Sequence, residues 1–256
     1  MKTKFTSLAL SLAGMSLASA TTFIRVDFNP VSPTGFSPLA AVFHDGSFDS
    51  FDGGDNLSGT GLETLAETGD ASGFVAGAPT SANTGVGSGN IGAGGSDSFI
   101  VEVADGNTQL NFASMVLFSS DWFIGNQNGQ ALDVSGLLGG AIGTNLVFDI
   151  TTVYDAGTET EDFTGVGGSG LFPFSTSGSL GVDITDGSVS VLDRSTNPYL
   201  DFTNTQNLDL AGFDPASLDA FTAASLGSIT FTVVPEPSIS LLGGLAGLTL
   251  LRRRRK

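Results

Sequence analysis

The chain has 256 residues, no cysteine and a formal net charge of −17, so neither disulfides nor thiol chemistry are available to it. Residues 21–234 hold 25 acidic residues against two basic ones, Arg25 and Arg194, a side-chain balance of −23. Such a charge repels nucleic acid and anionic lipid and attracts divalent cations or basic partners. These observations argue against a nucleic-acid-binding protein.

The first 20 residues have the pattern of a secretory signal peptide. Lys2 and Lys4 form a positive start, residues 5–17 are mostly apolar, and an A-x-A cleavage sequence ends at Ala20. We therefore expect signal peptidase to cut after Ala20, so that the exported chain begins near Thr21.

Short apolar runs predict β-strands in one domain over residues 21–234. Several runs alternate apolar and polar residues, and the spacers are rich in Gly, Asn, Asp and Ser. The chain contains 20 phenylalanines, whereas disordered acidic chains are poor in aromatics. The pattern predicts an all-β fold, an antiparallel β-sandwich. The predicted strands lie at 23–28, 39–43, 99–103, 115–118, 146–153, 182–191 and 229–234.

Two other segments carry local signals. Residues 62–67 predict one or two helical turns before Gly69. Residues 77–95 are rich in Gly, Ala, Ser and Asn and predict a flexible loop. This loop contains a formal G-x-G-x-x-G match at residues 87–92. A dinucleotide site also needs a preceding strand and a following helix, which the sequence does not predict here.

Several isolated polar residues have simple structural interpretations. A Gly/Ser-rich loop carries four aspartates whose spacing does not fit an EF-hand, and we expect it to be solvated: Asp45, Asp49, Asp52 and Asp55. His44, the only histidine, has no G-x-S-x-G sequence to pair with and is expected to orient a loop by hydrogen bonding. Trp122, the only tryptophan, is expected to be a packing anchor.

A Gly-containing turn at residues 155–159 brings two carboxylates together, and Asp121 ends an apolar run. Calcium binds six to eight hard oxygen ligands on loops that can curve around it, so these residues are candidate ligands. The alternative is that Asp155 caps its own turn through an Asx-type hydrogen bond. In that case Asp121 is an ordinary surface carboxylate. The residues alone leave both interpretations open.

Residues 235–256 predict a sorting segment rather than part of the domain. Pro235, Glu236 and Pro237 precede a 13-residue apolar run, 239–251, and five consecutive cations, 252–256. The run predicts a short apolar helix and is short for a bilayer span of roughly 20 residues. We expect transient membrane association through residues 239–251, with the cations on the cytoplasmic side.

This order of Pro-Glu-Pro, apolar segment and arginine cluster resembles the PEP-CTERM sorting signal of Gram-negative bacteria. The resemblance implies an exosortase partner that cuts near the motif after a transient inner-membrane intermediate, and a final location outside the cell or on its surface. The mature protein would then keep no transmembrane helix.

Three segments resemble the bacterial spondin domain. Residues 36–49, FSPLAAVFHDGSFD, followed by GLETLAETG at 61–69, look like its opening. Residues 113–125, ASMVLFSSDWFIG, are similar to its central segment, and residues 154–159, YDAGTE, to its D-A-G-T-[DE] turn. The order also agrees, and the resemblance covers roughly residues 22–163.

The spondin resemblance implies an eight-stranded antiparallel β-sandwich in a secreted adhesion or matrix protein. It also implies one cation site in the loops at one end, for which calcium is the expected ion. On this chain the implied ligands are the side chains of Asp121, Asp155 and Glu159 and the backbone carbonyl of Thr151. Glu159 stands where aspartate is usual, which keeps the charge and lengthens the side chain.

Two classes of function are compatible with the sequence. The first is a non-catalytic surface or matrix module that binds a polysaccharide, a surface protein or its own copies. The second is a secreted carboxylate-dependent hydrolase of the glycosidase type, which needs two carboxyl groups about 5 to 9.5 Å apart in a cleft. The lone histidine, the missing cysteine and the missing nucleophile motif favour the binding module.

Overall fold

The structure is a computed structural model that describes residues 21–31, 35–92, 94–116, 119, 121–159, 184–194 and 225–236. The predicted cleavage residue Ala20, the motif residue Pro237 and the apolar run 239–251 lie outside the described residues. Within the described ranges, no helix is long and apolar enough to cross a membrane.

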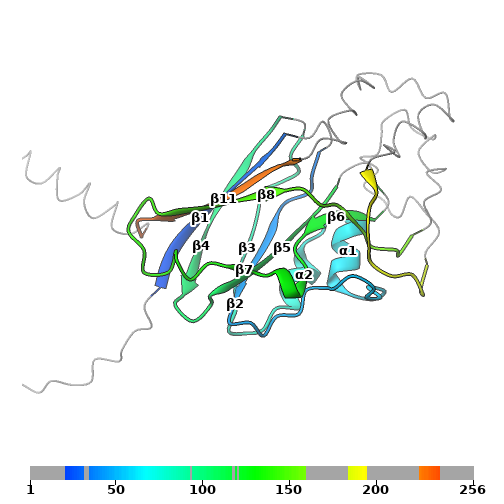
Figure 1. The fold of residues 1–256 in the computed structure, drawn as a ribbon, viewed down its shortest axis with the longest axis horizontal. Helices are drawn as coiled ribbons and strands as arrows, with labels where there is room; N and C mark the ends of the chain where they lie inside the picture. The colour runs from blue at the N-terminus through cyan, green and yellow to red at the C-terminus, as the bar shows by residue number, and fades with distance from the viewer. Residues whose placement is uncertain are drawn as a thin grey trace, which may run out of the picture.

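The first layer is a four-stranded antiparallel sheet (Figure 1). Its first and last strands in sequence pair along eight residues in the middle of the sheet. Phe23 lies opposite Val234, and Pro30 lies opposite Gly227, so residues 21 and 234 lie near each other at one end. In spatial order the strands are β4 (Asp97–Ala104), β1 (Thr21–Pro30), β11 (Gly227–Val234) and β8 (Asn145–Ile150).

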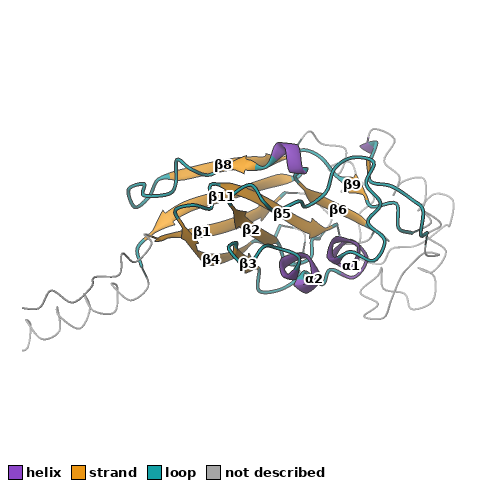
Figure 2. Ribbon diagram, turned by 90° about the horizontal axis from the view of Figure 1, so that it is seen from below, coloured by secondary structure: helices purple, strands orange, loops and turns teal. Residues whose placement is uncertain are grey.

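The second layer is a larger antiparallel sheet, packed against the first (Figure 2). In spatial order its strands are β10 (Ser190–Val191), β9 (Tyr154–Asp155), β6 (Trp122–Gly125), β5 (Gln109–Met115), β2 (Ala40–His44) and β3 (Asn83–Val86). The short β7 (Leu132–Asp133) also pairs with β5. Three short helical segments complete the described part: α1 (Gly61–Thr68), α2 (Ser72–Ala76) and the 3-10 turn η1 (Asn128–Gln130).

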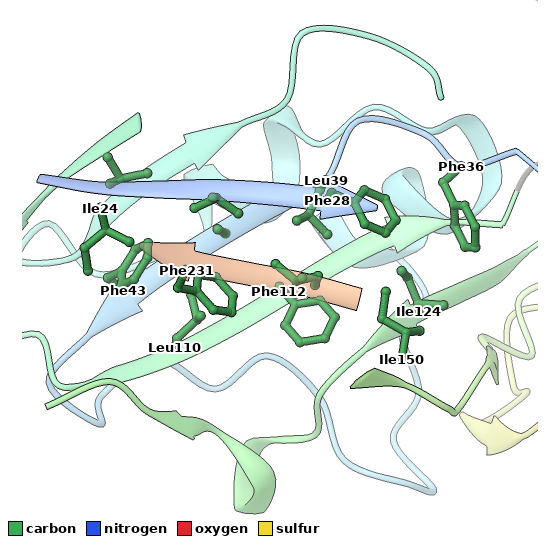
Figure 3. Packing of buried hydrophobic residues seen from close by; sticks show 14 of the residues in the cluster. Ile24, Phe28, Phe36, Leu39, Phe43, Leu110, Phe112, Ile124, Ile150 and Phe231 are labelled. Carbon is green, nitrogen blue, oxygen red and sulfur yellow. The ribbon is translucent and has the colours of Figure 1, made fainter. Parts of the chain in front are cut away.

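The main hydrophobic core fills the space between the two sheets. Alternate residues of β1, such as Ile24 and Phe28, are fully buried and meet inward-facing residues of β2 and β5 (Figure 3). Phe28 and Phe36 pack edge to face at 5.3 Å between ring centroids, a favourable aromatic geometry. Trp122 is fully buried in this core, which confirms its expected role as a packing anchor.

A second core lies between the outer face of the larger sheet and the two helices. Phe51 packs edge to face with Phe123 of β6 at 5.0 Å and with Tyr154 of β9 at 4.9 Å. The N-cap of α1 is Thr60, whose hydroxyl accepts the N–H of Glu63, and the Glu63 carboxylate accepts the N–H of Gly59, one residue before the cap. Both helices cover one face of the larger sheet, with α1 packed on β5 and β6 and α2 packed on β2.

The expected all-β sandwich is confirmed, as is the helix at 62–67. The described residues contain eleven strands, three of them two residues long, so the expected count of eight is not confirmed. Of the predicted strand at 115–118, Met115 is the last residue of β5 and Val116 forms an isolated β-bridge with Phe36, whereas residues 117 and 118 lie outside the described residues. Of the predicted strand at 182–191, only Ser190–Val191 is a strand among the described residues.

The prediction of a flexible loop over 77–95 is also wrong in part, because β3 lies inside it. A glycine is needed at position 85 of β3 for a steric reason, because a Cβ atom there would lie 2.5 Å from Cγ2 of Val101. Residues 87–92 come after this strand but lead into the strand β4 rather than a helix. The G-x-G-x-x-G match therefore lacks the helix N-terminus that a pyrophosphate requires.

Candidate metal site

Asp121 lies directly before β6 and is fully buried. Its Oδ2 atom accepts the backbone N–H of Thr158 at 2.9 Å and that of Glu159 at 3.1 Å. The hydroxyl of Thr158 lies 3.4 Å from the same oxygen. The alternative that Asp121 is an ordinary surface carboxylate is therefore wrong. The carboxylate instead fixes the turn after β9.

Two further acidic side chains lie near Asp121. Glu159 is 3% exposed and belongs to the turn that Asp121 holds. Glu67 lies in the last turn of α1. The pKa of Glu67 is raised to about 7, mainly by burial and in part by the negative charges of neighbouring carboxylates, while a hydrogen bond with Thr158 acts in the opposite direction. The neighbouring carboxylates are those of Glu63, Glu159 and Asp121. Negative charge is therefore concentrated between α1 and the β9 turn.

Asp155 is placed differently from Asp121. Its Oδ1 atom accepts the N–H of Gly157 at 2.7 Å, which is the Asx-type turn of the alternative interpretation. Burial raises the pKa of Asp155, and the hydrogen bond from Gly157 acts in the opposite direction. In the ladder between β6 and β9, Asp155 lies opposite Trp122. The Asp155 carboxylate thus accepts a hydrogen bond within its own turn, whereas the Asp121 carboxylate accepts the backbone N–H groups of residues 158 and 159.

The carbonyl of Thr151 accepts a hydrogen bond of 2.7 Å from Nη2 of Arg194. Burial lowers the pKa of this guanidinium. A positive side chain therefore contacts the carbonyl that the spondin resemblance assigns to a cation.

The chemistry of the carboxylates fits a hard divalent cation, since calcium prefers several carboxylate and carbonyl oxygens. The expected four ligands are not gathered around one point, however. Within the part of the chain that the structure describes, no group of three or more His, Asp or Glu side chains has an arrangement that could hold a metal ion. The structure brings Asp121 and Glu159 together and leaves Asp155 and Thr151 bonded to other partners.

The acidic loop after β2 behaves as expected from its composition. Its four aspartates are all exposed. Asp45 accepts the N–H of Ser47 at 3.1 Å, and Asp55 accepts the N–H of Asp52 at 2.7 Å. Hydrogen bonds from Ser47 lower the pKa of Asp45. These carboxylates stabilise the turns of a solvated loop.

His44 joins a buried polar network rather than a catalytic one. Its Nδ1 accepts the N–H of Gly46 at 3.1 Å, so Nε2 carries the proton and donates to Oδ1 of Asn111 at 2.7 Å. Asn111 donates in turn to Ser50 and to the carbonyl of Asn126. Burial lowers the pKa of His44. The ring therefore orients the loop after β2, as the sequence predicts.

A scan against protein-family models finds no model that matches this chain. A search of the curated proteins finds no match either.

Sequence reasoning missed Glu67. This residue is 54 positions away from Asp121 in the chain, and within α1 it looks like one of several helical glutamates. A weak signal was present, because residues 61–69 belong to the same spondin-like pattern as residues 113–125 and 154–159. Only the packing of α1 on β5 and β6 brings these segments together.

Proposed function

We propose that this protein is exported, cut by an exosortase and displayed on the surface or in the extracellular matrix of a Gram-negative bacterium. Its β-sandwich would act there as a calcium-dependent binding or adhesion module for a polysaccharide or a surface protein. The main support is the buried carboxylate of Asp121, next to the buried Glu159 and within the electrostatic reach of Glu67. A divalent cation would offset the repulsion among these like charges.

Calcium would be held by Asp121 and Glu159, with Asp155 and the carbonyl of Thr151 as the further ligands that the resemblance implies. To bind calcium, the Asp155 carboxylate would have to give up, at least in part, the hydrogen bond that it accepts from Gly157. The Thr151 carbonyl would likewise have to give up part of its bond from Arg194. The same burial argues against a glycosidase. Asp121 is fully buried and Glu159 is 3% exposed, so a sugar chain could not reach between them.

Calcium titration with thermal unfolding tests the metal proposal. A ligand that binds only the native state stabilises it by about 2.7 kcal/mol at a hundredfold excess over its dissociation constant. We expect calcium to raise the melting temperature of the wild type, and Asp155→Asn and Asp121→Asn to remove most of that rise.

The matched control is Asp52→Asn, which removes one exposed carboxylate from the acidic loop. It should respond to calcium as the wild type does. Equal responses in the wild type and in Asp155→Asn would mean that calcium only screens the surface charge, and the specific site would be wrong.

Intact-mass measurement of protein from the cell surface tests the sorting proposal. The expected chain begins near Thr21 and lacks most of the residues after Pro237. Pro235 and Glu236 come directly after β11 and are exposed, so a protease can approach them from solvent. A surface chain that still carries residues 252–256 would contradict cleavage by an exosortase.

A further inference from the structure

The two edges of the four-stranded sheet differ. At one edge, β4 packs beside β3 of the other sheet, where Gly85 lets the chain approach Phe99 and Val101. At the other edge, β8 pairs only with β11 among the described strands (Figure 2). A cavity of ≈ 220 Å³ lies beside the end of β8, lined by residues that include Phe148, Asn126 and Tyr154. Among the residues that the structure describes, the sandwich is thus closed along β4 and open along β8.

The backbone groups that point away from β11 can be identified from the register. The N–H of Val233 donates to the carbonyl of Thr144 at 2.9 Å, and the two strands then continue in register. In an antiparallel pair, bonded and non-bonded residues alternate. The bonded residues of β8 are therefore 146, 148 and 150. The N–H and C=O groups of Asn145, Val147 and Asp149 point toward the open edge.

Natural sheets protect such an edge with lysine, proline, a bulge or a covering segment, since exposed backbone groups attract another strand. The strand β8 has the sequence NLVFDI, with no lysine and no proline. Val147 is 55% exposed at its centre. The open edge therefore has the properties of a pairing strand.

We propose that β8 is a self-association site, through which a second copy of this chain adds its own β8 in antiparallel orientation. The two-fold axis would pass through Val147, so that the two four-stranded sheets join into one sheet of eight strands. The axis at Val147 involves none of the proposed calcium ligands, although the cavity at the end of β8 also includes Thr151 and Tyr154. The inference does not depend on the metal proposal.

The sequence of β8 is complementary to itself in this register. On the outer face, Val147 meets Val147 of the second copy, and Asn145 lies opposite Asp149 of the second copy. The amide of Asn145 can donate to that carboxylate. Asp149 is the only charged residue of β8, so no like charges face each other. On the inner face, Leu146 lies opposite Phe148 of the second copy.

The inner face adds apolar burial to the pairing. Leu146 and Phe148 are only partly buried at the margin of the main core, and Phe148 packs edge to face with Phe112 at 5.3 Å. A second β8 would cover both side chains and continue the core across the axis. An unrelated peptide would satisfy the backbone groups but would not in general match this pattern of valine, amide, carboxylate and apolar residues.

The net charge opposes association of two copies, because residues 21–234 carry a balance of −23. Salt screens such repulsion within a Debye length of about 10 Å at 0.1 M. Dimerisation should therefore strengthen as salt is added, since backbone pairing and apolar contact remain and the long-range repulsion fades.

Sedimentation equilibrium of the purified protein at several salt concentrations tests the proposal. Val147→Pro removes the central N–H of the open edge without removing a bond to β11, since proline is tolerated on the outward side of edge strands. We expect it to raise the dimer dissociation constant at least about tenfold. Val147→Thr, which keeps both the N–H and a β-branched side chain, should dimerise much as the wild type does.

A second pair of variants keeps the test independent of the proline. Asn145→Asp would place two carboxylates opposite each other and should weaken the dimer several-fold. Asn29→Asp adds the same charge on the outer side of β1, away from β8, and should have a smaller effect. Equal dissociation constants within both pairs, or a wild type that stays monomeric in high salt, would overturn the proposal.

Discussion

Two groups of acidic side chains show how differently this domain uses the same chemistry. In the loop after β2, four exposed aspartates lie in solvent, and two of them accept backbone N–H groups of their own turns. Between α1 and the β9 turn, Asp121 and Glu159 are buried, and Glu67 lies close enough for their negative charges to raise its pKa.

The difference is visible in the direction of the pKa shifts. Hydrogen bonds from Ser47 lower the pKa of the exposed Asp45. Burial and neighbouring charge raise the pKa of Glu67 to about 7. Composition alone cannot identify the second group, because its three residues come from separate parts of the chain. The environment decides whether a carboxylate helps to stabilise the metal-free fold or opposes it.

The largest effect is expected from Asp121→Ala. The substitution leaves the buried N–H groups of Thr158 and Glu159 without their acceptor, and each such loss costs about 1 to 3 kcal/mol. The relief of repulsion with nearby carboxylates offsets part of this cost. We expect the free energy of unfolding, measured with urea in a chelating buffer, to fall by about 2 to 3 kcal/mol. An unchanged value would show that the turn does not depend on this carboxylate.

A smaller change in the free energy of unfolding, a gain rather than a loss, is expected from Glu67→Gln. The pKa of Glu67 is raised from 4.5 to about 7, so between these pH values the folded protein binds more protons than the unfolded chain. The free energy of unfolding of the wild type should therefore fall as pH rises through this window. The glutamine variant lacks this term and should be more stable at pH 8 by roughly 1 kcal/mol, after a reduction for solvent screening.

Urea unfolding between pH 4 and 8 without metal, with both proteins side by side, measures the difference. Addition of calcium should reduce the pH slope of the wild type if the cation offsets the same charges. Parallel pH profiles for wild type and variant would contradict the raised pKa of Glu67.

The smallest effect is expected from Asp45→Ala, which serves as the exposed counterpart of both variants. The lowered pKa of Asp45 means that its contribution is present at neutral pH and is lost as pH falls below its ordinary value of 3.8. Because the side chain is fully exposed, the melting temperature at neutral pH should stay close to that of the wild type. A loss as large as that of Asp121→Ala would remove the distinction between the two groups.

The sandwich was predictable because apolar residues recur at every second position of several strands. The alternation in residues 23–28 and 229–234 corresponds to β1 and β11, and the capped helix at 62–67 is α1. The strand β3 was missed because its glycine, which suggests a loop, is required for close packing under Phe99 and Val101. Local composition could not reveal a steric reason that comes from a strand 12 or more residues later.

The candidate site was predictable only in part. Asp121 and Glu159 stand out in sequence because they fall in recognisable segments, and the structure places them in contact. Glu67 could not be found, because its importance comes from the docking of α1. The hydrogen bond of Thr151 could not be inferred, since its partner Arg194 is 43 residues away from Thr151. The Asx-type bond of Asp155 was one of the two interpretations that the sequence allowed, and the residues alone could not choose between them.

The pairing of β1 with β11 also determines which end of the domain lies farthest from the segment after β11. Residues 21 and 234 lie together at one end of the four-stranded sheet, whereas Pro30, Gly227 and Ile150 mark the other end, where the chain continues into β9 (Figure 1). Eight residues of strand separate these ends by roughly 25 Å. Attachment to a surface through the segment after β11 would therefore hold Asp121 and its neighbours outward, at the tip that first meets another cell or polymer.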